Sequence, residues 1–200
     1  MRITAEEKSA TRQRILQAAV ELFRARGFDA TTTRDIAGAA EIATGTLFNY
    51  FATKEAIVGS LAEEALVRAR ANFARRNGAR DLEENLFTLV ASELRQLKPL
   101  RKFIAPLLET SLSPLSTARR PEAAESLRIE HLEIVVQLAR GDGIAELSPL
   151  AMQVYWTLYM GVLAFWADDK SPKQEDTLAL LDQSLAMFVA WLNGGQGGNN

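Results

Sequence analysis

The chain of 200 residues has no cysteine and a single histidine. Without cysteine neither a disulfide nor a thiolate metal site can form, so we expect the reducing environment of the cytoplasm. One histidine argues against a zinc centre and a Ser-His-Asp triad, and we expect neither a metal nor another cofactor. The histidine itself, His131, stands beside Glu130 and Glu133, and we expect it on a solvated face without a role.

Long apolar runs and strand-like alternation are also missing. No apolar run reaches the ~18 residues that a membrane-spanning helix needs, and the N-terminal stretch MRITAEEKSATR lacks the apolar core of a signal peptide. We therefore expect no contact with a membrane. The composition, 48% hydrophobic and 24% charged, is that of a globular chain. The absence of period-two alternation predicts an all-α fold.

The net charge of −2 at pH 7 is divided unevenly along the chain. Residues 1–54 contain eight Lys and Arg against six Asp and Glu, whereas residues 55–200 contain fifteen against nineteen. A mildly basic N-terminal part on an acidic body fits a nucleic-acid binder. A surplus of two charges can also arise by chance, so charge alone decides nothing.

Residues 32–54 contain two short segments with helical periodicity, joined by Glu41-Ile42-Ala43. The apolar positions are Ile36, Ala37 and Ala40 in the first segment and Leu47, Tyr50 and Phe51 in the second. Thr32 and Asp35 form a capping pair at the first helix, and Thr44 can cap the second. Two short helices with a three-residue turn predict a helix-turn-helix, whose second helix enters the major groove of DNA.

A supporting helix is expected just upstream, because two short helices cannot bury a core alone. Residues 8–26 carry apolar side chains at helical spacing and end at Gly27, which can adopt the left-handed conformation of a C-cap. The stretch TRQRILQAAVELFRARGFDATTTRDIAGAAEIATGTLFNYFATKEAIV resembles the DNA-binding domain of the tetracycline-repressor (TetR) family of bacterial regulators. The resemblance implies a DNA-binding domain at residues 8–58 and a helical-bundle effector-binding and dimerisation domain at residues 59–193, with about nine helices in all.

The resemblance also implies which side chains of the helix-turn-helix contact DNA. Arginine can bind guanine, and threonine and phenylalanine can touch a thymine methyl group. Base contacts fall on Arg34, Thr44, Gly45 and Phe48. Phosphate contacts fall on Thr32, Thr33, Thr46, Asn49, Tyr50 and Lys54. The alternative for Arg34 is a solvated surface charge and for Tyr50 a largely packed ring, and Phe48 lacks the phenol that the family usually has there.

The remaining sequence predicts a body of further helices. Thr53 can cap a long helix that joins head and body and reaches Asn77-Gly78, and an apolar stripe follows over residues 82–97 and stops at Lys98-Pro99. Pro106 should kink or break the next apolar segment, and residues 113–121 indicate a loop. Another helix is expected over residues 122–140. Ser148-Pro149 and Ser171-Pro172 should each begin one of the last two helices.

Two sets of apolar residues in the body are candidate binding surfaces. The candidates for the lining of an effector cavity are Phe87, Phe103, Trp156, Tyr159 and Trp166. For any one of them, a place in an ordinary packed core is the alternative. The last helix carries two apolar rows, of which one can face the core and the other needs a partner. We assign the homodimer interface to Leu181, Leu185, Phe188 and Leu192, and the second row is Leu180, Met187 and Trp191.

These features predict a DNA-binding transcriptional regulator. The leading hypothesis is a homodimeric repressor that binds a palindromic double-stranded operator and is released by an apolar small molecule. One alternative is a helix-turn-helix protein without a small-molecule effector, either architectural or regulated by a partner. Another is an enzyme with an accessory DNA-binding module, but the sequence offers no catalytic triad, metal cluster or phosphate-binding glycine loop.

Overall fold

The structure, a computed structural model, describes residues 4–75, 81–104 and 122–196. Every regular element among these residues is helical, which confirms the predicted all-α fold. The elements are α1 (Ala5–Arg26), α2 (Thr33–Ala39), α3 (Thr44–Phe48), α4 (Lys54–Ala74), α5 (Leu82–Leu97), η1 (Lys98–Leu100), α7 (Glu122–Gly141), α8 (Pro149–Asp168), η2 (Pro172–Gln174) and α9 (Glu175–Gln196), where η denotes a short 3-10 helix. Residues 101–104 are helical as well.

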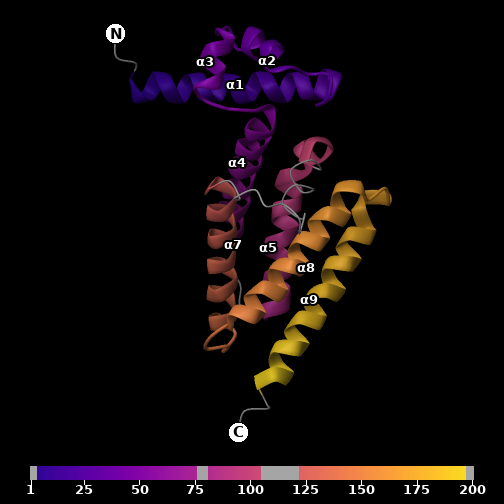
Figure 1. The fold of residues 1–200 in the computed structure, drawn as a ribbon. Coiled ribbons are helices and arrows are strands. Elements are labelled where there is room, and N and C mark those ends of the chain that lie inside the picture. Colours follow the sequence, from indigo (N-terminus) through magenta and orange to yellow (C-terminus); the bar gives the residue numbers. More distant parts are fainter. Residues whose placement is uncertain (1–3, 76–80, 105–121, 197–200) are drawn as a thin grey trace.

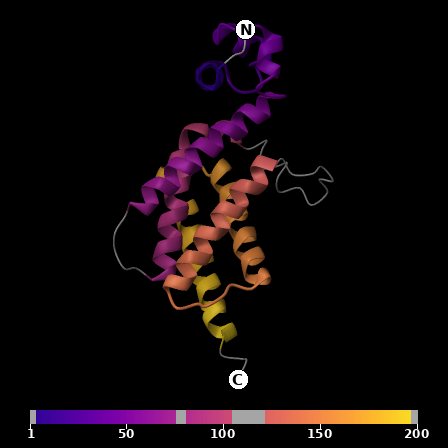
Figure 2. The same cartoon turned by 90° about the vertical axis from the view of Figure 1, so that its left-hand side faces the viewer.

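The molecule has a head and a body joined by one long helix (Figure 1). In the head, α1 lies across the beginning of α4, and α2 packs against both α1 and α3. From the head α4 runs into the body, where it packs along α5. Helices α7, α8 and α9 complete the bundle, with α8 and α9 side by side and the end of α9 farthest from the head (Figures 1 and 2).

The core of the head consists of one apolar face from each of its helices and from the start of α4. Its buried side chains include Ile15, Ala19, Phe23, Ile36, Ala37, Leu47, Phe51, Ile57 and Val58. Phe23 contacts Phe28, just beyond the end of α1, with ring centres 5.2 Å apart, and Phe103 of the body at 5.5 Å. Between Phe23 and Phe28, Gly27 ends α1 with a φ of +87°, a backbone region that favours glycine. The chain after α1 therefore turns back onto the core that head and body share.

Local hydrogen bonds determine where the helices of the head begin. Thr32 and Asp35 form the predicted reciprocal capping box at α2, and Thr53 caps α4 as predicted. The predicted capping role of Thr44 is wrong. This residue is the first of α3, and the N-cap is Ala43, which makes no side-chain hydrogen bond.

The boundaries of the body helices follow the sequence with one clear exception. As predicted, α5 ends where Lys98-Pro99 begins η1, and Ser148 caps α8 with Pro149 at its first position. Three predicted features lie outside the described residues: the Asn77-Gly78 cap, the kink at Pro106 and the loop at residues 113–121.

The exception is the beginning of α9, which does not start directly at Ser171-Pro172. The turn η2 intervenes, because Lys173 has a φ of 53°, which is incompatible with an α-helix. The carboxylate of Asp169 stabilises this corner by accepting hydrogen bonds from the backbone N–H groups of Ser171 and Thr177 and from the Thr177 hydroxyl. These hydrogen bonds hold the pKa of Asp169 well below its ordinary value.

Helix α8 has the length and average apolarity of a membrane-spanning helix, although it contains no uninterrupted apolar run of ~18 residues. The expectation counted uninterrupted apolar residues, whereas the average over α8 tolerates Gln153 and Thr157. In the structure α8 packs against α5 and α9 and buries Tyr155, Tyr159 and Trp166. A core helix of a globular bundle has the same composition, so this one helix is weak evidence for a membrane span.

Candidate nucleic-acid interface

Helix α3 is anchored by one side chain and leaves its neighbours accessible. Leu47 is fully buried in the core of the head, whereas Phe48 is 50% exposed. Gly45 is exposed and Thr44 is half-buried. On α2, Arg34 is exposed and makes no hydrogen bond or ion pair with any described residue. All four residues predicted to contact bases are therefore accessible, and the contacts themselves stay a prediction.

Gly45 is not required by the packing of the protein itself. A Cβ atom added at this position would meet no atom within 4 Å, and the residue has no positive φ. A glycine at this position can admit either a neighbouring backbone or a DNA edge, and no backbone approaches Gly45 among the described residues. The free space beside α3 is open to a ligand, which favours the DNA edge.

Some of the residues predicted to bind phosphate already use their side chains in hydrogen bonds within the protein, and others do not. The hydroxyl of Thr32 donates to Asp35 Oδ2 at 2.7 Å and accepts from the Asp35 N–H at 3.1 Å, so the capping box already uses it. The same contacts lower the pKa of Asp35 and keep it anionic. Four of the remaining residues make no side-chain hydrogen bond with any residue that the structure describes: exposed Asn49 and half-buried Thr33, Thr46 and Tyr50.

Lys54 is the second of these residues whose side chain already makes hydrogen bonds within the protein. Its ammonium group donates to the backbone oxygens of Phe28 at 2.9 Å and Thr31 at 3.3 Å, and it lies 4.2 Å from the centre of the Phe28 ring. These charge-assisted and cation–π contacts tie the beginning of α4 to the loop between α1 and α2. Since an ammonium has three N–H donors, one is left for the predicted phosphate contact. The sequence did not indicate the structural role of Lys54.

The residues predicted to line an effector cavity lie in separate places. Phe103 packs against Phe23 where head and body meet. Trp156 and Tyr159 pack around His131, with ring centres 6.0 Å and 4.3 Å from the imidazole. The other two are half-buried Phe87 and buried Trp166. The described residues do form a pocket, but it lies between head and body, and none of the five lines it.

His131 is buried, so its predicted place on a solvated face is wrong. The residue is 1% exposed, and Glu93 of α5 beside it is 0% exposed. Nδ1 of His131 donates to Glu93 Oε1 at 3.0 Å, and Nε2 lies 3.0 Å from the hydroxyl of Tyr155 on α8. A hydrogen-bonded chain therefore crosses the body from α5 through α7 to α8.

Arg70 extends this chain to α4. Its side chain is 10% exposed, and the guanidinium forms ion pairs with Glu93 Oε1 at 3.5 Å and Glu130 Oε2 at 2.6 Å. It also donates to the backbone oxygen of Leu127 at 3.0 Å. Helices α4, α5, α7 and α8 are thus connected by Arg70, Glu93, Glu130, His131 and Tyr155, which we call the buried cluster; Glu130 lies at its exposed edge.

The charges in the buried cluster determine which of its groups are ionised. Burial by itself would raise the pKa of Glu93, but the neighbouring His131 and Arg70 outweigh it, so the pKa is lowered and the group stays ionised. Burial raises the pKa of Tyr155 and Tyr159 well above the ordinary value, and the charge of Glu93 raises both further. Both tyrosine hydroxyls therefore stay protonated.

A sequence signal for the buried cluster did exist. Glu93 falls within the apolar stripe of α5, four residues after Leu89 and four before Leu97. His131 likewise lies four residues before Val135, which is buried on the same face of α7. A charged residue on an apolar helical face is seldom buried without a partner, so these two positions were candidates for a buried pair.

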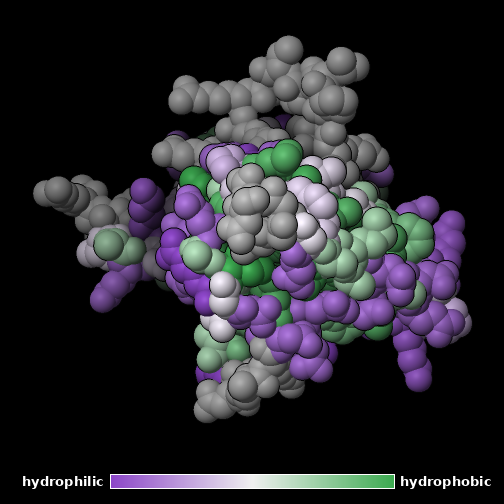
Figure 3. Space-filling view, turned by 90° about the horizontal axis from the view of Figure 1, so that it is seen from below, coloured by the Kyte–Doolittle hydropathy of each residue, from purple (hydrophilic) through white to green (hydrophobic). Residues whose placement is uncertain are grey.

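The row of α9 assigned to the dimer interface is packed inside its own protomer. Leu181, Leu185, Phe188 and Leu192 are between 2% and 8% exposed, so this assignment is wrong. The second row is the exposed one: Leu180 is 37%, Met187 68% and Trp191 44% exposed. Figure 3, which views the end of the body farthest from the head, shows apolar residues at the surface around the centre and toward the right of the view.

Comparison with known proteins is consistent with a head that binds DNA. Residues 15–61 match the profile described as bacterial regulatory proteins, tetR family, and residues 85–195, more than half of the chain, match the tetracyclin repressor-like C-terminal domain. The HTH-type transcriptional regulator UidR of Escherichia coli (strain K12) is 26% identical over 167 residues, which are 79% of this chain and 82% of UidR.

Two further similarities concern the head and the fold. The HTH-type transcriptional repressor KstR2 of Rhodococcus jostii is 46% identical over 54 residues, 27% of this chain and 26% of KstR2. The crystal structure of FadR of Thermus thermophilus, a repressor in complex with lauroyl-CoA, has a TM-score of 0.66 at 24% identity and covers 89% of this chain and 93% of its own. The chain belongs to the TetR family of bacterial DNA-binding transcriptional regulators.

Proposed function

We propose that the protein is a homodimeric repressor of a palindromic operator and that a largely apolar small molecule bound in the body releases it from DNA. The observation that carries the proposal is the accessible set on α2 and α3, Arg34, Thr44, Gly45 and Phe48, on a head with a well-packed core. KstR2 and FadR are named as repressors, which supports repression over activation. We also propose that the protein acts in the cytoplasm, because its proposed target is DNA.

The exposed apolar row of α9 supports the dimer. Leu180, Met187 and Trp191 lie on one helical face, and α8 beside it exposes Phe165 at 44%. An apolar surface of this kind on an outer helix pair favours a partner that covers it. The two-fold partner is a second copy, in which α8 and α9 meet their own counterparts.

The dimer test has to use the exposed row. Met187→Glu with Trp191→Glu is expected to give folded monomers in sedimentation, whereas charged residues at buried Leu185 or Phe188 would unfold the protomer. Val67→Glu is the matched control, because Val67 is 53% exposed on α4, away from this face. If the double variant stays dimeric, the interface lies elsewhere.

A two-fold dimer predicts the shape of the operator. The two heads present identical α3 helices, so each half-site should be the inverted copy of the other, with the helices roughly 34–36 Å apart in successive major grooves. Selection of bound fragments from genomic DNA, followed by sequencing, tests this. Binding sites without inverted symmetry would contradict the proposal.

Helix α4 is the connection through which the body can act on the head. Lys54 ties its first turn to the loop before α2, and Arg70 ties its far part to Glu93 and Glu130. A ligand that moves α5 or α7 must therefore either carry Arg70 along or break its ion pairs, of which the one with Glu93 is buried. A tilt of α4 changes the separation of the two heads, which simultaneous docking in successive grooves does not tolerate.

The proposed effector is apolar because the body is rich in aromatic and aliphatic residues. FadR of Thermus thermophilus was crystallised with lauroyl-CoA, so long-chain acyl thioesters are the first compounds to test. An effector has to bind the DNA-free conformation more tightly, and a coupling of about 5- to 150-fold in operator affinity is typical. Operator affinity is therefore measured with and without each compound.

The Trp156→Ala variant then localises the effect. Trp156 packs at the buried cluster, so this variant should lose the response to the effector and keep the operator affinity. If no compound changes operator affinity while genomic sites are bound specifically, the alternative holds, a DNA-binding protein without a small-molecule effector.

A further inference from the structure

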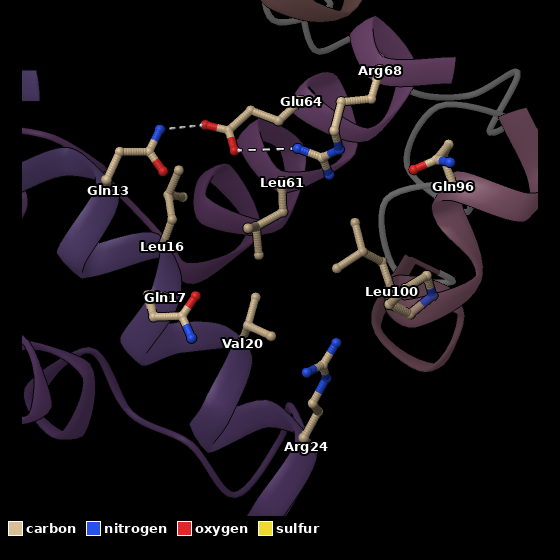
Figure 4. A pocket seen from close by; sticks show the side chains of 11 residues that line it. Gln13, Leu16, Gln17, Val20, Arg24, Leu61, Glu64, Arg68, Gln96 and Leu100 are labelled. Carbon is tan, nitrogen blue, oxygen red and sulfur yellow. Dashed lines mark hydrogen bonds and ion pairs between the residues drawn. The ribbon is translucent and has the colours of Figure 1, made fainter. Parts of the chain in front are cut away.

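The pocket between head and body is built from both parts of the molecule (Figure 4). Its walls come from α1 of the head, from α4, and from the segment that runs from the end of α5 into η1. The volume is about 340 Å³, at the lower end of the range of roughly 300–1,000 Å³ for small-molecule sites.

Apolar side chains from all three elements line the inner part of this junction pocket. Leu16 of α1, Leu61 of α4 and Leu100 of η1 are 2%, 8% and 5% exposed. Leu61, Leu100 and half-buried Val20 point toward the same open space in Figure 4. A short hydrocarbon chain placed there would therefore contact the head and the body together.

Two arginines lie at the mouth of the pocket and make few contacts with other described residues. Arg24 of α1 is exposed and makes no hydrogen bond or ion pair with any residue that the structure describes. The side chain of Arg68 on α4 is 58% exposed, and its one ion pair in the described chain is a long contact of 3.9 Å with Glu64. Both guanidinium groups are therefore available to an anion.

The single carboxylate in the lining is already satisfied. Oε1 of Glu64 accepts hydrogen bonds from Nη1 of Arg12 at 2.8 Å and from Nε2 of Gln13 at 2.9 Å. Because Glu64 makes its short contact with Arg12, Arg68 keeps only the long contact, and the lining carries a net positive charge from Arg24 and Arg68. The pocket thus combines an apolar interior with a cationic mouth.

We infer that the junction pocket is a binding site for a small amphipathic anion, a short-chain carboxylate or alkyl phosphate. Its chain lies on the leucines, and its anionic group binds Arg24 and Arg68, since guanidinium groups bind carboxylate and phosphate oxygens in bidentate fashion. This site is separate from the proposed effector site in the body, because neither Trp156 nor any other predicted effector residue lines it. The two sites can therefore be present or absent independently.

Occupancy of the junction pocket would affect the position of the head. A ligand that contacts α1 and η1 together fixes the separation of head and body at that point. If operator binding requires another separation, the ligand lowers operator affinity, and operator DNA lowers ligand affinity by the same factor. The proposed site therefore adds a second, chemically distinct input to the regulator.

The test uses octanoate, with octylammonium and octanol as probes of equal chain length and different charge. Calorimetric titration of the full-length protein at low salt should show binding of octanoate alone, and binding should weaken as salt screens the exposed arginines. The double variant Arg24→Gln, Arg68→Gln should weaken octanoate binding about fivefold or more, in line with two exposed charge pairs. Arg140→Gln, an exposed arginine at the far end of α7, is the matched control and should leave it unchanged.

Two further variants decide whether the site is the one inferred. Val20→Trp should fill the pocket and abolish octanoate binding without loss of thermal stability, whereas Trp156→Ala should leave octanoate binding intact. The inference is overturned if octanoate does not bind, or if octylammonium or octanol binds equally well. It is also overturned if the double arginine variant binds octanoate as the wild type does. The inference is also overturned if Trp156→Ala loses octanoate binding while the arginine and Val20 variants keep it. That result would instead support the effector site in the body.

Discussion

Removal of the Glu93 carboxylate should be among the most damaging single changes in the body. In Glu93→Ala, the guanidinium of Arg70 loses its contact at 3.5 Å and the imidazole of His131 loses its contact at 3.0 Å. Arg70 keeps its ion pair with Glu130, but His131 is 1% exposed and cannot reach water. Breaking a buried pair costs about 3–5 kcal/mol, and we expect a loss of this size in the free energy of unfolding. In Glu93→Gln, which keeps the shape and one acceptor, we expect a loss of about 1.5–3 kcal/mol.

The measurement is urea unfolding followed by far-ultraviolet circular dichroism at one fixed protein concentration, because dimerisation makes apparent stability depend on concentration. Glu133→Ala is the matched control, since Glu133 is exposed on α7 close to His131 and should change stability by less than about 0.5 kcal/mol. A loss below about 1 kcal/mol in Glu93→Ala would show that the buried cluster is not held together as described.

The pH dependence of the same pair of proteins gives an independent check. The pKa of Glu93 in the folded protein lies below its ordinary value of 4.5. The stabilisation from its charge is therefore fully present above pH 4.5 and is lost as the pH falls through the lowered value. The stability difference between the wild type and Glu93→Gln should shrink as the solution is acidified below pH 4.5. Asp35 and Asp169 titrate in the same direction, but they are present in both proteins and cancel in the difference. A difference that stays constant down to acid unfolding would contradict the assigned charge state.

Three further predictions concern the head. Lys54→Met removes the hydrogen bonds to the Phe28 and Thr31 carbonyl oxygens, so it should lower the melting temperature, and if the ammonium also binds a phosphate it should reduce the salt slope of DNA binding by about one. Unchanged stability would rule out the structural role, and an unchanged slope the phosphate contact. Thr44→Ala should change base preference at one position of each half-site without altering the salt slope, which selection of bound sequences measures. Thr53→Ala removes the cap of α4 and should cost about 1 kcal/mol in urea unfolding, and a loss near zero would show that the cap is not needed.

The features that the sequence determined by itself are those whose partners are close along the chain. Thr32 and Asp35 are three residues apart and form their capping box wherever the helix lies. The apolar stripe of α5, its end before Pro99, and the cap and first proline of α8 are likewise decided within one or two helical turns. This is why the all-α fold and the helix-turn-helix, together with the exposure of Arg34 and Phe48, followed from local pattern and resemblance.

Tertiary structure alone decided the features whose partners are distant. The contact of Lys54 with Phe28 joins residues 26 positions apart, and that of Glu93 with His131 joins residues 38 apart. Of the two apolar rows on α9, periodicity shows both and cannot say which meets the core, because this depends on the position of α5 and α8 around the helix. The junction pocket has the same origin, since Arg24 and Arg68 share its mouth only because α1 crosses α4. A helical repeat specifies the faces of a helix, whereas the packing of the whole chain selects the neighbour of each face and thereby decides which charges are buried and which remain available to ligands.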